Sequence, residues 1–225
     1  MNPKIYAVLT GDLIGSRKLK DQGISYLEHL NESLEYVGHN YQIPFYIYRG
    51  DSFQGVTYDI TSALKDAIIL RLMLISSFEA DVKCPRIDAR ISIGVGKIDL
   101  PINIERKIGE MDGEAFRNSG LKLEDIKKEK QNLAIITPWT EVNEELDIYC
   151  IMIDRLIARW SKKKCEAVRY RLEGHILEEI GNKLNIDPSS VFRRLKGTDY
   201  DLVEMITQRY SKIVNKKLDE LSEDE

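Results

Sequence analysis

The sequence predicts an α+β fold in which a ferredoxin-like or palm domain, an antiparallel sheet with its helices on one face, is followed by an all-α segment. Strand-like and helical stretches follow one another in the order β-α-β-β-α-β, with one extra strand, up to about residue 140. After Pro138 only helical patterns remain. With 225 residues, 43% hydrophobic and 31% charged, the chain has the composition of a globular protein that buries its own core.

The strands and helices of the first part are recognised by runs of apolar residues and by the turn-forming residues that end them. Residues 5–9 are β-branched and apolar and stop at Thr10-Gly11-Asp12, which predicts a buried strand that ends in a loop. The expected strands cover residues 5–9, 45–48, 52–56, 87–95 and 133–137. Apolar residues at steps of three and four predict helices over 21–39 and 61–78, and a lysine-rich helix precedes the last strand.

The second part begins with an apolar stripe at alternating steps of four and three, formed by Val142, Leu146, Tyr149, Ile153, Leu156 and Trp160. This pattern resembles a coiled coil, but it spans fewer than three heptads, so packing against the chain itself is favoured over a dimer seam. Two short helices are expected at 171–184 and 188–196, with Asp187 as the cap and Pro188 in the first turn. The expected units are residues 1–140, a linking helix at 141–164, a helical domain at 165–217 and an acidic tail at 218–225.

Charge is distributed unevenly along the chain, whose total is −4. Residues 1–149 carry 18 basic against 23 acidic side chains, residues 150–217 carry 15 against 9, and residues 218–225 carry five acidic side chains and no basic ones. The basic region is suited to a nucleic-acid partner, and the acidic end to a frayed, solvated tail. No apolar run is long enough to cross a bilayer and no leader is evident, so we expect a cytoplasmic protein without membrane contact.

Two carboxylates of the first part are candidates for a metal site. Asp12 follows the first expected strand, and Asp51 lies in the hairpin between the second and third. In a palm sheet the first and third strands are antiparallel neighbours, so the two aspartates are expected to converge, and paired carboxylates suit Mg²⁺ or Mn²⁺. Taken singly, Gly-Asp is ordinary turn chemistry and Asp12 a helix cap. We expect the metal at Asp12 and Asp51, and nucleotide phosphates at Gly15, Ser16, Arg17 and Ser52.

These motifs together resemble known families. Asp12-Leu-Ile-Gly-Ser16, Gly50-Asp-Ser-Phe53, Arg90-Ile-Ser-Ile-Gly-Val-Gly96 and Gly113-Glu-Ala-Phe116 resemble the successive motifs of class III nucleotidyl cyclases and their GGDEF-type palm relatives. The resemblance implies that Asp12 and Asp51 hold the metal ions that activate a nucleoside triphosphate. The full set, with its helical C-terminal part, is similar to the SatD family of bacterial proteins over nearly the whole chain.

The sequence departs from the cyclase pattern at the positions that stabilise charge. Cyclases carry an asparagine and an arginine on the helix after the glycine-marked turn, where this chain has Arg117 and Leu121, and a base-reading lysine where it has Ile47. Loss of these groups removes electrostatic stabilisation of the phosphoryl group, although Lys122 and Arg117 are candidates to substitute. Robust cyclase activity is therefore not expected.

Residues 180–195 resemble the helix-turn-helix of bacterial DNA-binding proteins. The resemblance implies that the second helix faces the major groove or its phosphates, and Arg193 and Arg194 are the strongest candidates. The alternative is a plain helical hairpin with a solvated basic face, favoured by the acidic residues on the first helix. The residues expected at DNA are Ser189, Ser190, Phe192, Arg193, Arg194 and Lys196.

The favoured function is a DNA-binding regulator with a metal- and nucleotide-sensing palm domain, in which the ligand binds one domain or dimer arrangement better than another. The first alternative is a metal-dependent nucleotidyltransferase or cyclase of altered specificity. The second is an inert palm scaffold whose helical part contacts other proteins. Expected partners are DNA, a nucleotide and, in some arrangements, a second copy of the chain.

Overall fold

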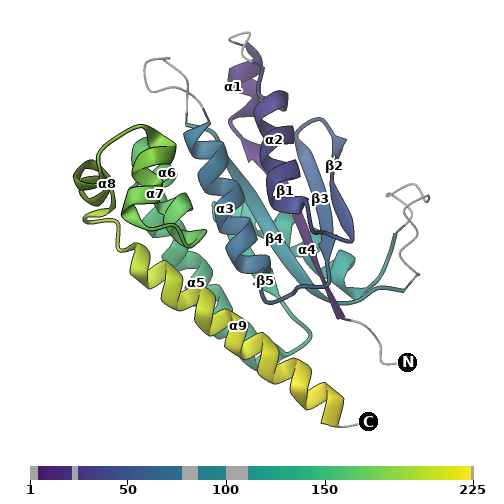
Figure 1. Ribbon diagram of the computed structural model, residues 1–225. Coiled ribbons are helices and arrows are strands. Elements are labelled where there is room, and N and C mark those ends of the chain that lie inside the picture. Colours follow the sequence, from purple (N-terminus) through teal and green to yellow (C-terminus); the bar gives the residue numbers. More distant parts are fainter. Residues whose placement is uncertain (1–4, 22–24, 78–85, 100–110, 224–225) are drawn as a thin grey trace.

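A five-stranded sheet forms the centre of the computed structural model, which describes residues 5–21, 25–77, 86–99 and 111–223 (Figure 1). The strands are β1 (Ile5–Ile14), β2 (Ile43–Arg49), β3 (Ser52–Thr57), β4 (Asp88–Lys97) and β5 (Leu133–Ile136). Their order across the sheet is β2-β3-β1-β4-β5. The pairs β2–β3, β3–β1 and β1–β4 are antiparallel, as expected, but β4 and β5 are parallel because α4 crosses between them.

The helices of the described ranges are more numerous than the sequence pattern indicates, and the expected ones have shifted boundaries. They are α1 (Ser16–Asp21), α2 (Leu27–Gly38), α3 (Ala63–Ser76), α4 (Glu114–Glu129), α5 (Thr140–Ala158), α6 (Lys162–Leu172), α7 (Leu177–Leu184), α8 (Pro188–Leu195) and α9 (Tyr200–Glu223). The helix expected at 171–184 is interrupted because Gly174 adopts a φ of 96° and ends α6. The linking helix ends at Ala158, and residues 218–223, expected to fray, continue α9.

Helices cover both faces of the sheet, which corrects the expectation of one covered face. On one face, Ala7 and Leu9 join the apolar cluster that contains Leu34 of α2 and Ile68 of α3. On the other, Tyr6 and Val8 cluster with Ala115 and Phe116 of α4. Helix α4 lies so close to β4 that a β-carbon at Gly94 would be 2.2 Å from the Ala115 carbonyl oxygen. In Figure 1, α2 and α3 lie in front of the sheet and α4 lies behind it.

Strand β1 is longer than the sequence pattern indicates. The expected loop at Thr10-Gly11-Asp12 is part of the strand, which continues to Ile14 and is paired on both sides. Gly11 interrupts the apolar pattern because the ring of Phe53 lies over it, 2.5 Å from where its β-carbon would be. Asp12 consequently sits within the sheet, opposite Ser52 of β3 and Arg90 of β4.

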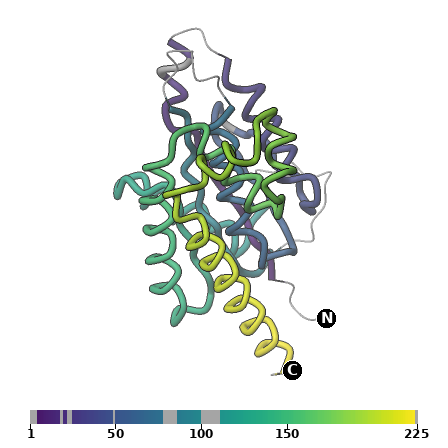
Figure 2. Tube along the Cα trace, turned by 60° about the vertical axis from the view of Figure 1, so that its left-hand side comes forward, coloured from purple at the N-terminus to yellow at the C-terminus, as the bar shows by residue number. Residues whose placement is uncertain are grey.

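The C-terminal helices share one apolar cluster with the sheet and with α2 and α3. The predicted stripe of α5 faces this cluster, with Leu146, Ile153 and Trp160 buried. The indole of Trp160 donates to the Thr198 carbonyl (2.9 Å), and the Tyr210 hydroxyl of α9 donates to the Ile60 carbonyl (3.0 Å). Figure 2 shows α5 and α9 running beside each other along the molecule. The described helices are all too short or too polar to span a membrane.

A buried ion cluster joins the sheet to these helices. The Arg71 side chain of α3 is 1% exposed and donates two 2.9 Å bonds to the carboxylate of Asp88 on β4. It donates a third bond, of 2.6 Å, to Asp154 of α5. The second oxygen of Asp154 accepts from the backbone amides of Asn132 and Leu133 at the start of β5. Burial lowers the pKa of Arg71, but the two carboxylates outweigh it and raise the pKa above its usual value.

Substitution of Arg71 by methionine is expected to destabilise the fold strongly, because two buried carboxylates lose their cation. Removal of one partner of a buried pair costs about 3–5 kcal/mol. Urea unfolding measures this loss, and Arg155→Met on the exposed side of α5 is the matched control. Equal unfolding midpoints for the two variants would contradict the role of Arg71.

Candidate functional site

The first candidate site lies at the end of β1, where Asp12 is held between two cations. Its Oδ1 lies 3.5 Å from Nη1 of Arg90, its neighbour on β4. Its Oδ2 lies 3.3 Å from Nζ of Lys127, a residue in the last turn of α4. Lys127 also contacts Oε1 of Glu124 at 2.6 Å. The four side chains form a row of ion pairs in which Asp12 is 15% exposed, and the buried Nε of Arg90 has no hydrogen-bond partner among the described residues.

Asp51 lies in the turn before β3, next to the segment of β1 that carries Asp12, but its side chain has different partners. The Asp51 carbonyl accepts from the amide of Leu13 at 3.2 Å, and Ser52 is directly opposite Asp12. The expected convergence of the two chain segments is therefore present. The Asp51 carboxylate, however, accepts a hydrogen bond from the buried hydroxyl of Ser16 at the start of α1.

The two carboxylates expected to hold a divalent cation already have partners among the described residues. Both oxygens of Asp12 face cationic groups, and Asp51 accepts from Ser16. Mg²⁺ takes one or two carboxylates and completes its octahedral shell with water or phosphate oxygens, so an ion at Asp12 would lie beside the Lys127 ammonium and the Arg90 guanidinium. Among the described ranges, no group of three or more His, Cys, Asp or Glu side chains lies close enough together to hold a metal ion.

The remaining residues expected at a nucleotide surround the same edge. Gly15 has a φ of 90° and turns the chain from β1 into α1, where Ser16 is buried and Arg17 is exposed. Ser52 lies near Tyr48 of β2, whose side chain is half-exposed. The pKa of Tyr48 is raised above its usual value, mainly because the side chain is partly buried. The charge of Lys127 lowers this pKa, and the charge of Asp12 raises it. The edge therefore combines hydroxyl groups, an exposed guanidinium and an aromatic ring.

The groups that we considered as substitutes for the cyclase charges lie elsewhere. Arg117 pairs with Asp99 and Asp112 at exposed positions. Lys122 pairs with Asp147 of α5 at 3.2 Å, and Leu121 is exposed. Ile47 packs against the apolar cluster on the α2 side of the sheet. The cations near Asp12 are instead Arg90 and Lys127.

The second candidate site is the outer face of α8. Helices α7 and α8 are joined by a short turn in which Asn185 is left-handed (φ 51°). Gly181 allows this turn to pack closely, since a β-carbon there would be 2.7 Å from the Ile186 carbonyl. Asp187 caps α8 by accepting from the Ser190 amide, and Val191 and Leu195 are buried.

Most of the expected DNA-contacting residues are exposed on α8, but one of them packs against α6. Ser189, Phe192, Arg193 and Lys196 are exposed. Ser190 donates to the Asp187 carboxylate and accepts from Arg193 at 2.8 Å. Arg194, one of the two strongest candidates, is only 20% exposed and is paired with Glu166 of α6 at 2.9 Å. The structure therefore places Arg194 in the contact between α6 and α8, away from the exposed face.

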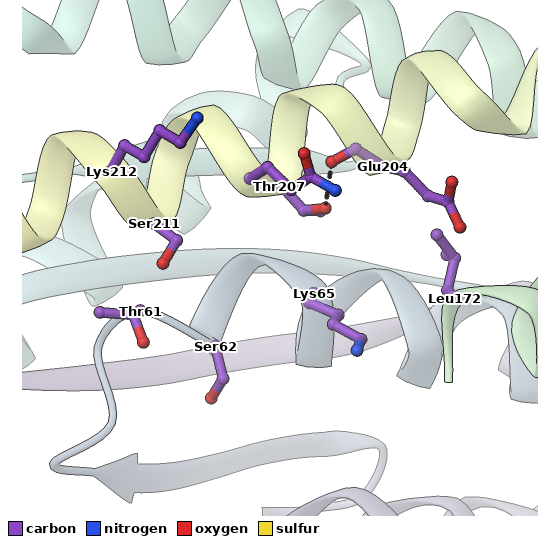
Figure 3. A pocket seen from close by; sticks show the side chains of 9 residues that line it. Thr61, Ser62, Lys65, Leu172, Glu204, Thr207, Ser211 and Lys212 are labelled. Atoms are coloured by element: carbon purple, nitrogen blue, oxygen red, sulfur yellow. Dashed lines mark hydrogen bonds between the residues drawn. The ribbon is translucent and has the colours of Figure 1, made fainter. Parts of the chain in front are cut away.

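Among the grooves of the described residues, one lies beside the expected DNA-contacting side chains and another lies away from them. A groove of about 650 Å³ runs along one side of α8 and includes Ile176, Phe192 and Tyr200 in its walls. A second, of about 580 Å³, separates the start of α3 from α9, and Figure 3 shows the side chains that line it. Lys65 and Lys212 come from opposite walls there, among serine and threonine hydroxyl groups. The second groove contains none of the predicted site residues.

Comparison with protein families identifies the chain. The SatD family matches residues 6–211. The chain belongs to the SatD family. Comparison with the curated proteins gives no match.

Cyclase domains are among the solved structures similar to this SatD-family chain. The active GGEEF domain of a diguanylate cyclase from Vibrio cholerae aligns with 15% identity and a TM-score of 0.42, over 60% of this chain and 83% of that one. The dimeric guanylyl cyclase domain of the RhoGC fusion protein from the aquatic fungus Blastocladiella emersonii aligns with 14% identity and a TM-score of 0.41, over 54% and 74%. The adenylyl cyclase CyaB from P. aeruginosa has 17% identity and a TM-score of 0.37, over 53% and 71%.

Sequence reasoning missed the cations that hold Asp12. Arg90 stands in the quoted strand motif, but the motif does not reveal that β4 pairs with β1 at Asp12. Lys127 is one of several lysines on a charged helix, and only the packing of α4 distinguishes it from Lys128. Arg71 did carry a signal, because it is a lone charge within the apolar run of α3.

The cap of α8 in this SatD-family chain gives a prediction about pH. Hydrogen bonds from Ser189 and Ser190 hold the pKa of Asp187 well below its usual range. The stabilisation by the cap is therefore complete above the unfolded pKa of about 3.9 and is lost as pH falls through the lower folded pKa. Thermal unfolding should show Asp187→Ala less stable than wild type at pH 7, with a smaller difference at pH 3.

Asp187→Asn is the matched variant because its amide oxygen still caps but does not titrate. The difference between the thermal midpoints of Asp187→Asn and Asp187→Ala should be similar at pH 7 and at pH 3. A constant difference between wild type and Asp187→Ala across this range would contradict the titrating cap.

Proposed function

We propose that this SatD-family chain binds double-stranded DNA through the outer face of α8. The observation that carries the proposal is the separation of the two faces of this helix. Val191 and Leu195 are buried, while Ser189, Arg193 and Lys196 are exposed on the opposite side. Hydroxyl and guanidinium groups on a short helix of this kind contact base edges and phosphates in the major groove.

Charge and support around α8 favour the same proposal. The region 150–217 carries an excess of six positive charges, although the whole chain is acidic. Helix α6, which pairs with α8 through Glu166 and Arg194, begins with Lys162-Lys163-Lys164. Lysines in such a position contribute sequence-independent contacts to the phosphate backbone. The acidic residues Glu178 and Glu179 lie on α7, and Glu178 lines the same groove as Phe192 and Lys196.

The proposal predicts different outcomes for neighbouring arginines. Arg193→Ala and Lys196→Ala should weaken binding to a labelled mixed-sequence duplex and reduce the slope of log affinity against log salt by about 0.9 for each phosphate that is no longer neutralised. Arg194→Ala should change binding less, because its side chain is engaged with Glu166. Fluorescence anisotropy at several salt concentrations measures both quantities.

Lys212→Ala is the control, since it removes one exposed positive charge from α9, away from α8. Its binding should equal that of the wild type. If Arg193→Ala and Lys196→Ala also leave affinity and salt slope unchanged, α8 is not the DNA-contacting helix.

A nucleotide site at the end of β1 is a second candidate function. The observation that favours it is the register of the sheet, which brings Asp12, Ser52 and the Gly15-Ser16-Arg17 turn to one edge. Backbone amides and a guanidinium at such a turn suit the phosphates of a nucleotide. A DNA-binding chain with this second site would act as a nucleotide-responsive regulator.

Thermal unfolding with a panel of nucleoside triphosphates tests this second function. A bound ligand at a hundred times its dissociation constant stabilises the native state by roughly 2.7 kcal/mol. The increase should diminish in Arg17→Ala and persist in Lys20→Ala, which removes another exposed charge from the same short helix. An increase that is the same in both variants would place the ligand elsewhere, and no increase with any nucleotide would rule the function out.

A further inference from the structure

The packing of α4 directs one lysine toward the sheet. Leu123 and Ile126 of α4 are buried against Ala134 of β5 and fix the last turns of the helix on the sheet. Lys127, the next residue, lies toward β1 and is 31% exposed, while Lys128 is 76% exposed and forms an ion pair with Asp125 of its own helix. Two adjacent lysines of one helix thus have different surroundings.

The Lys127 ammonium group is held firmly as a cation. It lies 2.6 Å from Glu124 Oε1 and 3.3 Å from Asp12 Oδ2. A lysine ammonium group is charged at neutral pH, so the pairing of Lys127 with Asp12 and Glu124 is present there.

A divalent ion at Asp12 would compete with this ammonium group. Metal coordination requires a carboxylate oxygen at short range, and Lys127 faces one oxygen of Asp12 while Arg90 faces the other. An ion bound there would be close to two positive groups, and like charges at such distances repel strongly outside bulk water. Metal binding therefore requires that Lys127 move away from β1.

We infer that Lys127 is the built-in cation of the Asp12 carboxylate and excludes divalent metal from this edge of the sheet. The ion pair thereby holds the last turn of α4 against β1. Displacement of Lys127 would free Oδ2 of Asp12 for a metal ion, while Arg90 stays beside Oδ1. This competition needs neither DNA nor a nucleotide, although Asp12 belongs to the edge at which the second proposed function places a nucleotide.

The inference is tested by titration of the full chain with Mn²⁺, with the free ion measured by electron paramagnetic resonance. Lys127→Met should bind Mn²⁺ at least about tenfold more tightly than wild type, because a neighbouring positive charge is removed. Lys128→Met, the matched control on the same helix, should bind like wild type. The double variant Asp12→Asn/Lys127→Met should lose the gain, because the carboxylate ligand is absent.

Two results would overturn the inference. Equal affinity of Lys127→Met and wild type would show that Lys127 does not compete with the ion. A gain that persists in Asp12→Asn/Lys127→Met would show that the ion binds elsewhere. Circular dichroism establishes that each variant is folded, and Lys127→Gln replaces Lys127→Met if the latter is not. Mn²⁺ should also raise the thermal midpoint of the single variant and not that of wild type.

Discussion

The fold depends on the guanidinium of Arg71, which is buried at the point where four elements meet. It binds Asp88 of β4 and Asp154 of α5, and Asp154 in turn accepts from the first amides of β5. A charge is tolerated at this depth only because every nearby carboxylate oxygen has a donor. Helix α3, the parallel pair β4–β5 and the first C-terminal helix are therefore positioned by one set of hydrogen bonds. The same pair of strands carries Arg90 to the side of Asp12 and supports α4, from which Lys127 extends.

The two candidate sites differ in how their charges are balanced. At the end of β1, the acidic and basic side chains are matched within the chain, and Asp12 is enclosed by Arg90 and Lys127. On the outer face of α8, Arg193 and Lys196 are exposed, and the arginine that has an acidic partner, Arg194, faces inward. A surface with exposed cations attracts a polyanion over a longer range than a row of ion pairs does. The exposed cations of α8 therefore suit a polyanion such as DNA better than the paired charges at the end of β1 suit a nucleotide.

Local sequence patterns predict much of the fold. The candidate sites depend on contacts between residues far apart in the sequence, which local patterns do not reveal. The order of strands and helices, the hairpin at Gly50 and the cap at Asp187 are encoded by neighbouring residues. The extension of β1 through Gly11 is not, because it depends on Phe53 of another strand filling the space above the glycine. Nor does the sequence show that α4 covers the second face of the sheet through Gly94. The partners of Asp12, Asp51 and Arg194 are all remote in sequence, so their roles could be assigned only from the structure.

The hydrogen bond from Tyr210 to the Ile60 carbonyl has a consequence for how the chain can be divided. Tyr210 is fully buried and belongs to α9, whereas Ile60 lies in the turn before α3, 150 residues earlier. A fragment that ends near residue 140 would leave that carbonyl without its donor and would expose the apolar surface of α3 to water. The reciprocal C-terminal fragment would expose Trp160 and the inner side of α6. The two halves are thus expected to melt in a single cooperative transition, and shortened fragments are expected to be poor substitutes for the whole chain.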